Sequence, residues 1–444
     1  MMRTNSNLKV TKKNIRKRKI FMLRESVLTE NPNFATIKSI LYCVLLGFIL
    51  RDVTVSFVLK QKVTYGLYLL QHGFDKFPIT LMVWCLFFCF NLLTYFFYNF
   101  WSNLRVTFAA LSKLLDWIFL VIFLSYIAGI LYLVPFVVKN IKMGLVTAFV
   151  FCIEQIRLLM KSYAFIRTNV PNVLNYQQHT DKMFFRPSLK HYLYFSFAPT
   201  LVYRHEYPRY NVIRWTFVTQ HFFEFVACIW TVSYVAETVF LYKIQNINIS
   251  ENFFSQVFKI IIEGAIAGLI AKLLLFYAVL HCWLNAFAEM LRFGERQFYT
   301  DWWTATNYKI FFRKWNIVVS DWLYEYIYQD FFETITPNSR TTSKLIVFLI
   351  SAIFHEYIGT VSSQHFFPLL FLIFLISGLA FTHINTKHRL FNIPFLYFTG
   401  LGVALLSTFY AIEFVVNQNC AINKTNVLYN LIPRILRNEC VNFI

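Results

Sequence analysis

Charged residues are scarce in this chain of 444 residues. Asp, Glu, Lys and Arg make up 14% of it, whereas hydrophobic residues make up 57%. A soluble domain carries about 25% charged residues, so this composition places most of the chain in lipid. Glycine is also scarce, with twelve residues, which argues against closely crossed small-residue helix pairs as the main packing mode. Fifty-two Phe and twenty-six Tyr supply the bulk instead.

Acidic residues are few as well, and the formal net charge is +20. No nucleic-acid motif accompanies this excess, so we expect no nucleic-acid partner. Residues 1–30 hold nine Lys or Arg, six of them within 11–19 (TKKNIRKRK), against Glu25 and Glu30. This distribution predicts a cytosolic N-terminus that is attracted to anionic lipid. No short apolar stretch with a small-residue cleavage site follows, so we do not interpret it as a signal peptide.

Nine apolar runs are long enough to cross a bilayer, which needs roughly 20 residues per helix. The sequence therefore predicts an all-α polytopic membrane protein with about nine transmembrane helices. We expect a basic segment at 1–35, a membrane-embedded domain at 36–418 and a tail at 419–444. The nine runs lie at about 37–59, 77–99, 108–137, 143–165, 214–242, 256–287, 345–364, 366–385 and 392–417.

The odd number of spans predicts a lumenal C-terminus when the N-terminus is cytosolic. Cys420 and Cys440 flank the polar tail, and two cysteines in an oxidising compartment favour a disulfide. The sequon at 423–425, which begins with Asn423, would then face the lumen, where it can be glycosylated. The six other cysteines lie in apolar segments without metal-ligand spacing, and we interpret them as inert buried thiols.

One ionisable residue lies deep in an apolar run. His355 follows ten uncharged residues, 345–354, within the sequence SAIFHEY. Burying such a group in lipid is costly, so it is a functional hypothesis by default. A structural histidine that bonds to a neighbouring helix is the alternative, and position alone leaves the two equal. Ser351, one turn earlier, shares the helix face of His355.

The polar connection at 288–344 is unusually aromatic, and we expect it to carry function. It contains FYTDWW at 298–303, RKWN at 313–316 and SDWLY at 320–324. Aromatic rings lie well at headgroup depth, so the composition predicts re-entrant or interfacial helices. An anchoring belt without chemistry is the alternative that composition alone favours.

Taken in order, these motifs resemble the sterol O-acyltransferase branch of the membrane-bound O-acyltransferase (MBOAT) superfamily. That branch carries FYxDWWN, a later WN, HDWLY and a buried HEY, and its FAPTLxYR…YPR and HCWLNAFAEML segments match residues 197–209 and 281–291. The resemblance runs from about residue 23 to the C-terminus. It implies an endoplasmic reticulum enzyme that transfers a long-chain acyl group from acyl-CoA to a sterol hydroxyl. Diacylglycerol or a fatty alcohol as acceptor, and a non-catalytic lipid-binding or transport protein, remain as alternatives.

The resemblance also implies roles for individual residues. His355 matches the catalytic histidine, and Asn316 matches the asparagine that works with it. Trp315 would border the reacting thioester. Further acyl-CoA contacts are expected from Arg313, Tyr328, Ser351, Arg340 (where the family has lysine), Tyr299, Asp301, Trp302 and Trp303.

Two positions depart from the family pattern. Thr304 ends the first box (FYTDWWT, 298–304), where the family has Asn, and Ser320 replaces the histidine of HDWLY. Thr304 offers a hydroxyl but loses the amide, and Ser320 loses a contact with phosphate or pantetheine. These changes bear on substrate preference more than on activity.

The chemistry is consistent with these residues. A thioester is already activated, so transfer to an alcohol needs deprotonation of the hydroxyl and stabilisation of the oxyanion. Neutral imidazole, with an unperturbed pKa of about 6.5, suits the first task. Arg313 and Arg340 can meet the CoA phosphates. We expect no metal and no cofactor beyond acyl-CoA as co-substrate, with membrane lipids around a homodimer or homotetramer.

Other polar residues in the apolar runs are interpreted more plainly. Glu263, Lys272 and His281 recur nine residues apart in one run. They could line a tunnel, but hydrogen bonding inside the bundle is the favoured interpretation. Arg51 and Asp52 predict a local charge pair or an interfacial feature, and His221 and Glu224 are assigned no role.

Overall fold

The computed structural model describes residues 21–31, 33–58, 65–175, 186–245, 247, 252–335, 339–379, 386 and 388–419. These residues form helices, and extended backbone pairs only at two isolated bridges within them, Arg24 with Glu295 and Arg209 with Phe293. The predicted all-α fold is confirmed. The helices are α1 (Val27–Glu30), α2 (Phe34–Val58), α3 (Leu67–Gly73), α4 (Phe77–Thr107), η1 (Ala109–Leu111), α5 (Ser112–Ile141), α6 (Leu145–Leu174), α7 (Leu189–Phe197), α8 (Trp215–Val235), η2 (Ala236–Leu241), α9 (Tyr242–Gln245), α10 (Phe253–Phe276), η3 (Tyr277–Trp283), α11 (Leu284–Met290), η4 (Trp302–Thr304), α12 (Tyr308–Lys314), α13 (Ile317–Trp322), η5 (Leu323–Tyr328), η6 (Phe331–Ile335), α14 (Arg340–Ser363), α15 (Leu369–Leu379), η7 (Arg389–Phe391) and α16 (Asn392–Asn419).

Six helical runs within the described residues are long and apolar enough to cross a membrane, which makes the chain a polytopic membrane protein. The three other predicted spans overlap α2, α6 and α15, and the described part of α15 has 11 residues. α6 differs from the six runs because the charged residues Glu154, Arg157 and Lys161 lie within it. The six runs are Phe77–Thr107, Ala109–Ile141, Trp215–Ile244, Phe253–Met290, Arg340–Ser363 and Arg389–Glu413.

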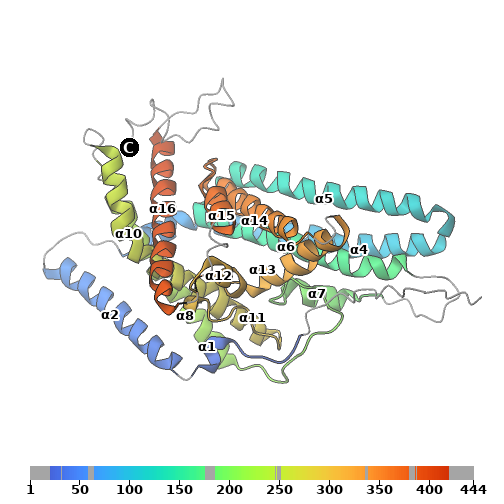
Figure 1. The fold of residues 1–444 in the computed structure, drawn as a ribbon, viewed down its shortest axis with the longest axis horizontal. Coiled ribbons are helices and arrows are strands. Elements are labelled where there is room, and N and C mark those ends of the chain that lie inside the picture. Colours follow the sequence, from blue (N-terminus) through green and yellow to red (C-terminus); the bar gives the residue numbers. More distant parts are fainter. Residues whose placement is uncertain are drawn as a thin grey trace, which may run out of the picture.

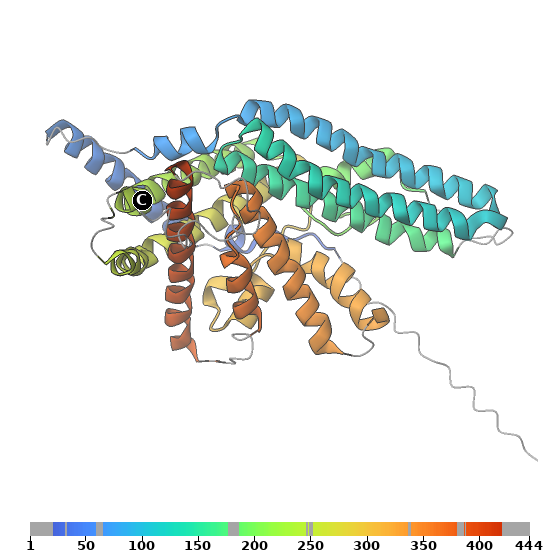
Figure 2. The ribbon, with the colours of Figure 1, turned by 90° about the horizontal axis from the view of Figure 1, so that it is seen from above.

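α4, α5 and α6 lie side by side and extend to one end of the molecule (Figures 1 and 2). A buried amide joins the unit to α7, because Asn91 of α4 accepts hydrogen bonds from Ser162 of α6 at 2.9 Å and from Tyr192 of α7 at 3.0 Å. Stacked rings fill the space between α4 and α5, including Trp101 and Phe119 at 4.6 Å. Aromatic side chains thus supply the packing that the composition indicated.

α10 and α16 pack closely together at the other end (Figure 1). A Cβ atom added to Gly268 would lie 2.5 Å from the backbone oxygen of Gly400, and one added to Gly400 would overlap the backbone oxygen of Ala265. This pair is therefore a small-residue crossing, although glycine is rare in the chain. Low glycine content limits how many such crossings can form and does not prevent this one.

Four segments of the described chain are π-helical: η2, η3, η5 and η6. η3 interrupts the run from Phe253 to Met290 and buries Tyr277 and His281. π-helical turns are often found at functional sites. α14 lies centrally and packs against α15, α6 and η5.

The cysteines divide differently from the prediction. Cys152, Cys228 and Cys282 are buried, but Cys43, Cys85 and Cys89 are exposed. The interpretation as buried thiols is therefore wrong for three of the six, because these three lie on outward faces of α2 and α4. The predicted Cys420–Cys440 disulfide and the sequon at Asn423 lie outside the described residues.

Candidate active site

α14 positions His355 and sets the state of its ring. The helix begins after Ser339, whose side chain accepts a hydrogen bond from Thr342 N, as N-cap serines do. The Nδ1 atom of His355 lies 2.6 Å from the carbonyl oxygen of Ser351. Because a carbonyl oxygen only accepts, Nδ1 carries the proton in the neutral ring and Nε2 keeps its lone pair. Phe374 stacks on the imidazole at 3.8 Å between centroids.

The hydrogen bonding of His355 bears on the structural alternative. Its one strong hydrogen bond is to its own helix, and within the described chain none joins it to a neighbouring helix. Nε2 makes no hydrogen bond to any described residue. His355 therefore does not tie the bundle together through hydrogen bonds, and it leaves the basic nitrogen available.

Residues next to His355 hold α14 and α15 in place. Glu356 Oε2 accepts a hydrogen bond from Phe371 N, at the start of α15, at 3.0 Å. The hydroxyl of Tyr357 donates to Leu131 O at 3.1 Å and accepts from Gln155 Nε2 at 2.9 Å. Glu356 thus orients the helix that carries Phe374, whereas Tyr357 anchors α14 to α5 and α6.

Asn316 has a local structural task. Its side-chain oxygen caps α13 by accepting a hydrogen bond from Val319 N at 3.2 Å. The amide NH2 then remains as a donor, and no described residue accepts from it. Two backbone hydrogen bonds join this segment to the first box: Ile317 N to Phe298 O at 2.8 Å, and Thr300 N to Lys314 O at 2.9 Å. Local pairing therefore brings together two motifs that are separate in the sequence.

Trp315 and Trp302 form the centre of an aromatic cluster. Their ring centroids lie 4.6 Å apart in an edge-to-face arrangement, which the charge distribution of aromatic rings favours. Trp302 is fully buried, and Trp303 packs against it at 6.1 Å. Tyr299 is also buried, and its hydroxyl lies 2.6 Å from His281 Nδ1. Tyr299 also contacts Trp303 at 6.4 Å, so ring contacts join all three predicted aromatic residues of the box to one another and to Trp315.

Asp301 and Thr304 lie at the exposed rim of this cluster. Asp301 forms an ion pair with Lys314 at 3.0 Å, and the Thr304 hydroxyl donates to Asp301 Oδ2 at 3.0 Å. Partial burial opposes ionisation, but the hydrogen bonds from Lys314 and Thr304 outweigh it and lower the pKa of Asp301. The threonine that departs from the family pattern thus supports the loop through its hydroxyl.

The remaining predicted residues are spread around the site. Arg313 and Arg340 are exposed, and neither forms an ion pair with a described acidic side chain. Tyr328 stacks between Tyr324 at 5.5 Å and Phe332 at 5.9 Å. The hydroxyl of Ser320 makes no hydrogen bond to a residue that the structure describes.

The structure shows how the segments that carry His355 and Asn316 are joined. His355 lies on α14 and Asn316 precedes α13, and no hydrogen bond joins these two described residues. Their elements meet through Phe312 of α12 and Phe348 of α14, whose rings lie 5.3 Å apart, and through packing of α14 on η5. α14 therefore contacts α12 and η5, the elements that lie before and after the segment of Asn316 and α13.

Comparison with known proteins decides the family. The model of the membrane-bound O-acyltransferase family matches residues 67–412. The chain belongs to this family. It is 34% identical to sterol O-acyltransferase 1 of Mus musculus over 425 residues, which is 94% of this chain and 78% of the relative. It is 33% identical to sterol O-acyltransferase 2 of Mus musculus over 94% of this chain and 80% of that relative. The family resemblance read from the motifs is confirmed.

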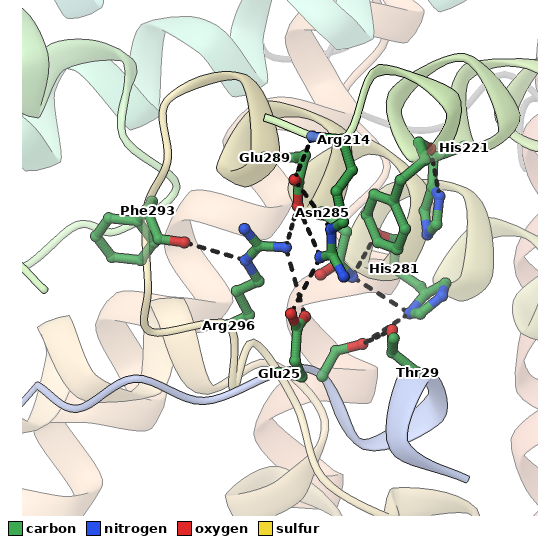
Figure 3. Close-up of polar contacts among 11 residues, drawn as sticks. Glu25, Thr29, Arg214, His221, His281, Asn285, Glu289, Phe293 and Arg296 are labelled. Atoms are coloured by element: carbon green, nitrogen blue, oxygen red, sulfur yellow. Dashed lines mark hydrogen bonds and ion pairs between the residues drawn. The ribbon is translucent and has the colours of Figure 1, made fainter. Parts of the chain in front are cut away.

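Sequence reasoning missed a buried ionic cluster in this member of the MBOAT family (Figure 3). Glu289 forms ion pairs with Arg296 at 2.6 Å and with Arg214 at 2.8 Å, and Glu25 approaches the same arginines at 3.4 and 3.0 Å. The hydrogen bonds that Arg214 donates to Glu289 raise the pKa of Arg214. Arg296 is fully buried and stands two residues before the first box. The sequence offers one signal, because Glu289 and Arg296 lie just after an apolar run, but it does not show which charges pair.

The predictions for polar residues inside the apolar runs are confirmed in some cases and not in others. The prediction of hydrogen bonding inside the bundle is confirmed for His281, which pairs with Tyr299 (2.6 Å). Glu263 instead forms an exposed ion pair with Lys243 at 2.6 Å. The charge pair between Arg51 and Asp52 is confirmed at 3.8 Å.

A second hub that the sequence did not indicate forms around Glu224. This buried carboxylate accepts hydrogen bonds from Lys38 at 3.0 Å and Tyr42 at 2.9 Å, both on α2. It also accepts from Tyr277 of η3 at 2.5 Å. Glu224 therefore attaches α2, which lies at the edge of the molecule in Figure 1, to the centre of the bundle.

Proposed function

We propose that this chain transfers a long-chain fatty acyl group from acyl-CoA to the hydroxyl of a sterol. The observation that carries the proposal is the match to sterol O-acyltransferases over 94% of the chain. The same proposal assigns His355 as the general base and Asn316 as its partner. The arrangement of His355 Nε2 supports the first assignment, and the uncommitted amide of Asn316 supports the second.

In this mechanism, His355 Nε2 removes the proton of the acceptor hydroxyl while the oxygen attacks the thioester carbon. The new C–O bond gives a tetrahedral oxyanion, which the NH2 group of Asn316 stabilises by donating a hydrogen bond. The C–S bond then breaks, and the protonated imidazole returns its proton to the departing CoA thiolate. The products are a sterol ester and free CoA, with no net change at His355.

The donor is proposed to lie along the aromatic connection. Trp315 borders the thioester. The first box, with Tyr299, Asp301, Trp302 and Trp303, packs against Trp315 on the side away from the thioester. Arg313 and Arg340 meet the CoA phosphates, while Tyr328 and Ser351 line the route to His355. Exposed cations without acidic partners among the described residues suit phosphate recognition.

We further propose how the protein lies in its membrane. It resides in the endoplasmic reticulum with its N-terminus in the cytosol and its C-terminus in the lumen. Residues 1–35 form a basic cytosolic segment, 36–418 the membrane-embedded domain and 419–444 a tail closed by a disulfide. The chain works as a homodimer or homotetramer.

An acyl-transfer assay with purified protein in lipid nanodiscs tests the function. Labelled oleoyl-CoA is offered with a sterol, diacylglycerol or a fatty alcohol, each in a separate reaction. We expect a labelled ester with the sterol and much less with the other two acceptors. Faster transfer to diacylglycerol or the fatty alcohol would reassign the acceptor, and no transfer to any of them would favour a non-catalytic lipid-binding protein.

A further inference from the structure

Lys272 is a cation in the middle of a membrane helix. It is the twentieth residue of the 38-residue helical run Phe253–Met290. A lysine near the end of a span can extend its ammonium to the interface, but this position is far from both ends. Ionisable residues at such depth are rare and are retained where they have a partner or a task.

The partners of Lys272 are aromatic rings. Its Nζ atom lies 4.8 Å from the ring centroid of Phe311 and 5.0 Å from that of Trp315. No acidic side chain of the described residues forms an ion pair with it. The other lysine of this helix, Lys259, is exposed and lies 3.9 Å from Glu263. Lys272 is therefore held by cation–π contacts, which strengthen when the cation is removed from water.

These contacts help to fix the Trp315 ring. Phe276 lies one turn after Lys272 on the same face of α10 and contacts Trp315 at 5.3 Å between centroids. Trp302 contacts the indole at 4.6 Å and Phe311 at 5.2 Å. The ring thus lies among three aromatic neighbours, and the ammonium of Lys272 adds a charged contact.

We infer that Lys272 is a positioning residue that orients Trp315, and through it Asn316, for use of the acyl-CoA thioester. The inference rests on the proposed function, because the task of Trp315 is assigned there. Asn316 follows Trp315 directly in the chain, so an indole held in the cluster restrains the Trp315 backbone and with it the start of the Asn316 side chain. Lys272 and Phe276 hold the indole from the side of α10, and the backbone hydrogen bond from Ile317 N to Phe298 O holds the chain just after Asn316.

The test compares Lys272→Met, which is unbranched, one atom shorter and uncharged, with Lys272→Arg, which keeps a cation that stacks on aromatic rings. Lys259→Met is the matched control, since it makes the same change on the outer face of the same helix. Each full-length protein is placed in nanodiscs. The measurements are kcat and KM for oleoyl-CoA, the affinity for a non-reactive thioether analogue of oleoyl-CoA, and the thermal unfolding midpoint.

We expect Lys272→Met to lower kcat/KM for oleoyl-CoA about tenfold, with weaker binding of the thioether analogue. Lys272→Arg should stay within about threefold of the parent, and Lys259→Met should match it. In a Trp315→Leu background, Lys272→Met should cause no further loss, because the two residues act as a unit. If Lys272→Met fails to fold, Trp315→Phe keeps a weaker π face and should show a smaller loss of the same kind.

Parental kinetics and analogue binding in folded Lys272→Met would overturn the inference. Equal losses of kcat/KM in Lys272→Met and Lys272→Arg would overturn it as well. So would a double variant of Lys272→Met and Trp315→Leu whose loss of kcat/KM is the product of the two single losses. A parent protein that transfers no acyl group would instead contradict the proposed function. The thioether analogue then still tests Lys272, since unchanged affinity in Lys272→Met would count against its positioning role.

Discussion

His355 shows how one residue can be prepared for chemistry by its own helix. The carbonyl of Ser351 fixes which ring nitrogen carries the proton, and Phe374 fixes the plane of the ring. Neither contact uses Nε2. The side chain is thus oriented without occupying the atom that proton transfer requires.

Replacing His355 with Ala should lower the rate of ester formation by about 10²–10⁴-fold, the usual contribution of a positioned base. The protein should still insert and bind acyl-CoA. Single-turnover assays with equal amounts of folded protein measure the effect. Glu356→Gln is the control, because it keeps an oxygen that can accept from Phe371 N, and it should lose far less. Esterification by His355→Ala at the parental rate would contradict the mechanism.

Asn316 combines a cap with a proposed donor, and two substitutions separate them. Asn316→Asp keeps an oxygen for Val319 N but removes the NH2 group, so we expect a severe loss of kcat with little loss of stability. Asn316→Ala removes both and should also lower stability by about 0.5–2 kcal/mol, the cost of losing a helix cap. Rate measurements and thermal unfolding distinguish the two effects. An active Asn316→Asp variant would leave only the capping role.

At the scale of elements, close packing of α10 on α16 depends on glycine residues, which have no side chain. Gly400 faces the backbone of α10 without room for a Cβ atom, whereas a Cβ atom on Gly402 of the same helix would meet nothing within 4 Å. Helices that approach so closely gain van der Waals contact between their backbones. This crossing also holds the helix that carries Lys272.

Gly400→Ala should therefore destabilise the protein by about 1–3 kcal/mol, the typical cost of overpacking. Gly402→Ala should be neutral or slightly stabilising, since alanine is the better helix former by about 1 kcal/mol. Thermal unfolding midpoints in the same detergent compare the two variants. Equal midpoints would show that α10 and α16 can separate without cost.

At the scale of the whole molecule, a segment near the N-terminus is tied to the loop before the first aromatic box. Arg24 N donates to Gly294 O at 2.8 Å, and Arg296 N donates to Arg24 O at 2.9 Å. Glu25 adds the ion pairs seen in Figure 3. Arg24 and this loop therefore lie on the same side of the membrane.

The proposed topology leads to a whole-molecule test. In sealed microsomes, protease should remove an epitope at the N-terminus and spare one at the C-terminus until detergent is added. Mass mapping without reductant should find Cys420 joined to Cys440. Digestion of the C-terminal epitope in sealed vesicles would contradict the proposed orientation. Finding both thiols free would contradict the proposed disulfide.

The sequence determined by itself that this is a helical membrane protein of the acyltransferase family. Bilayer thickness imposes a fixed length on apolar runs, so hydropathy locates spans without knowledge of their neighbours. The motifs around Trp315 and His355 are local strings, and they identified the family before any contact was known.

Tertiary structure alone decided which distant residues meet. Glu289 pairs with Arg214, which lies 75 positions away, Lys272 meets the ring of Trp315, and Gly268 faces Gly400. Hydropathy and motif strings describe each residue with its neighbours along the chain. Pairing of charges, rings and backbones across helices depends instead on how the helices are packed, and that packing minimises the free energy of the whole bundle rather than of any one segment.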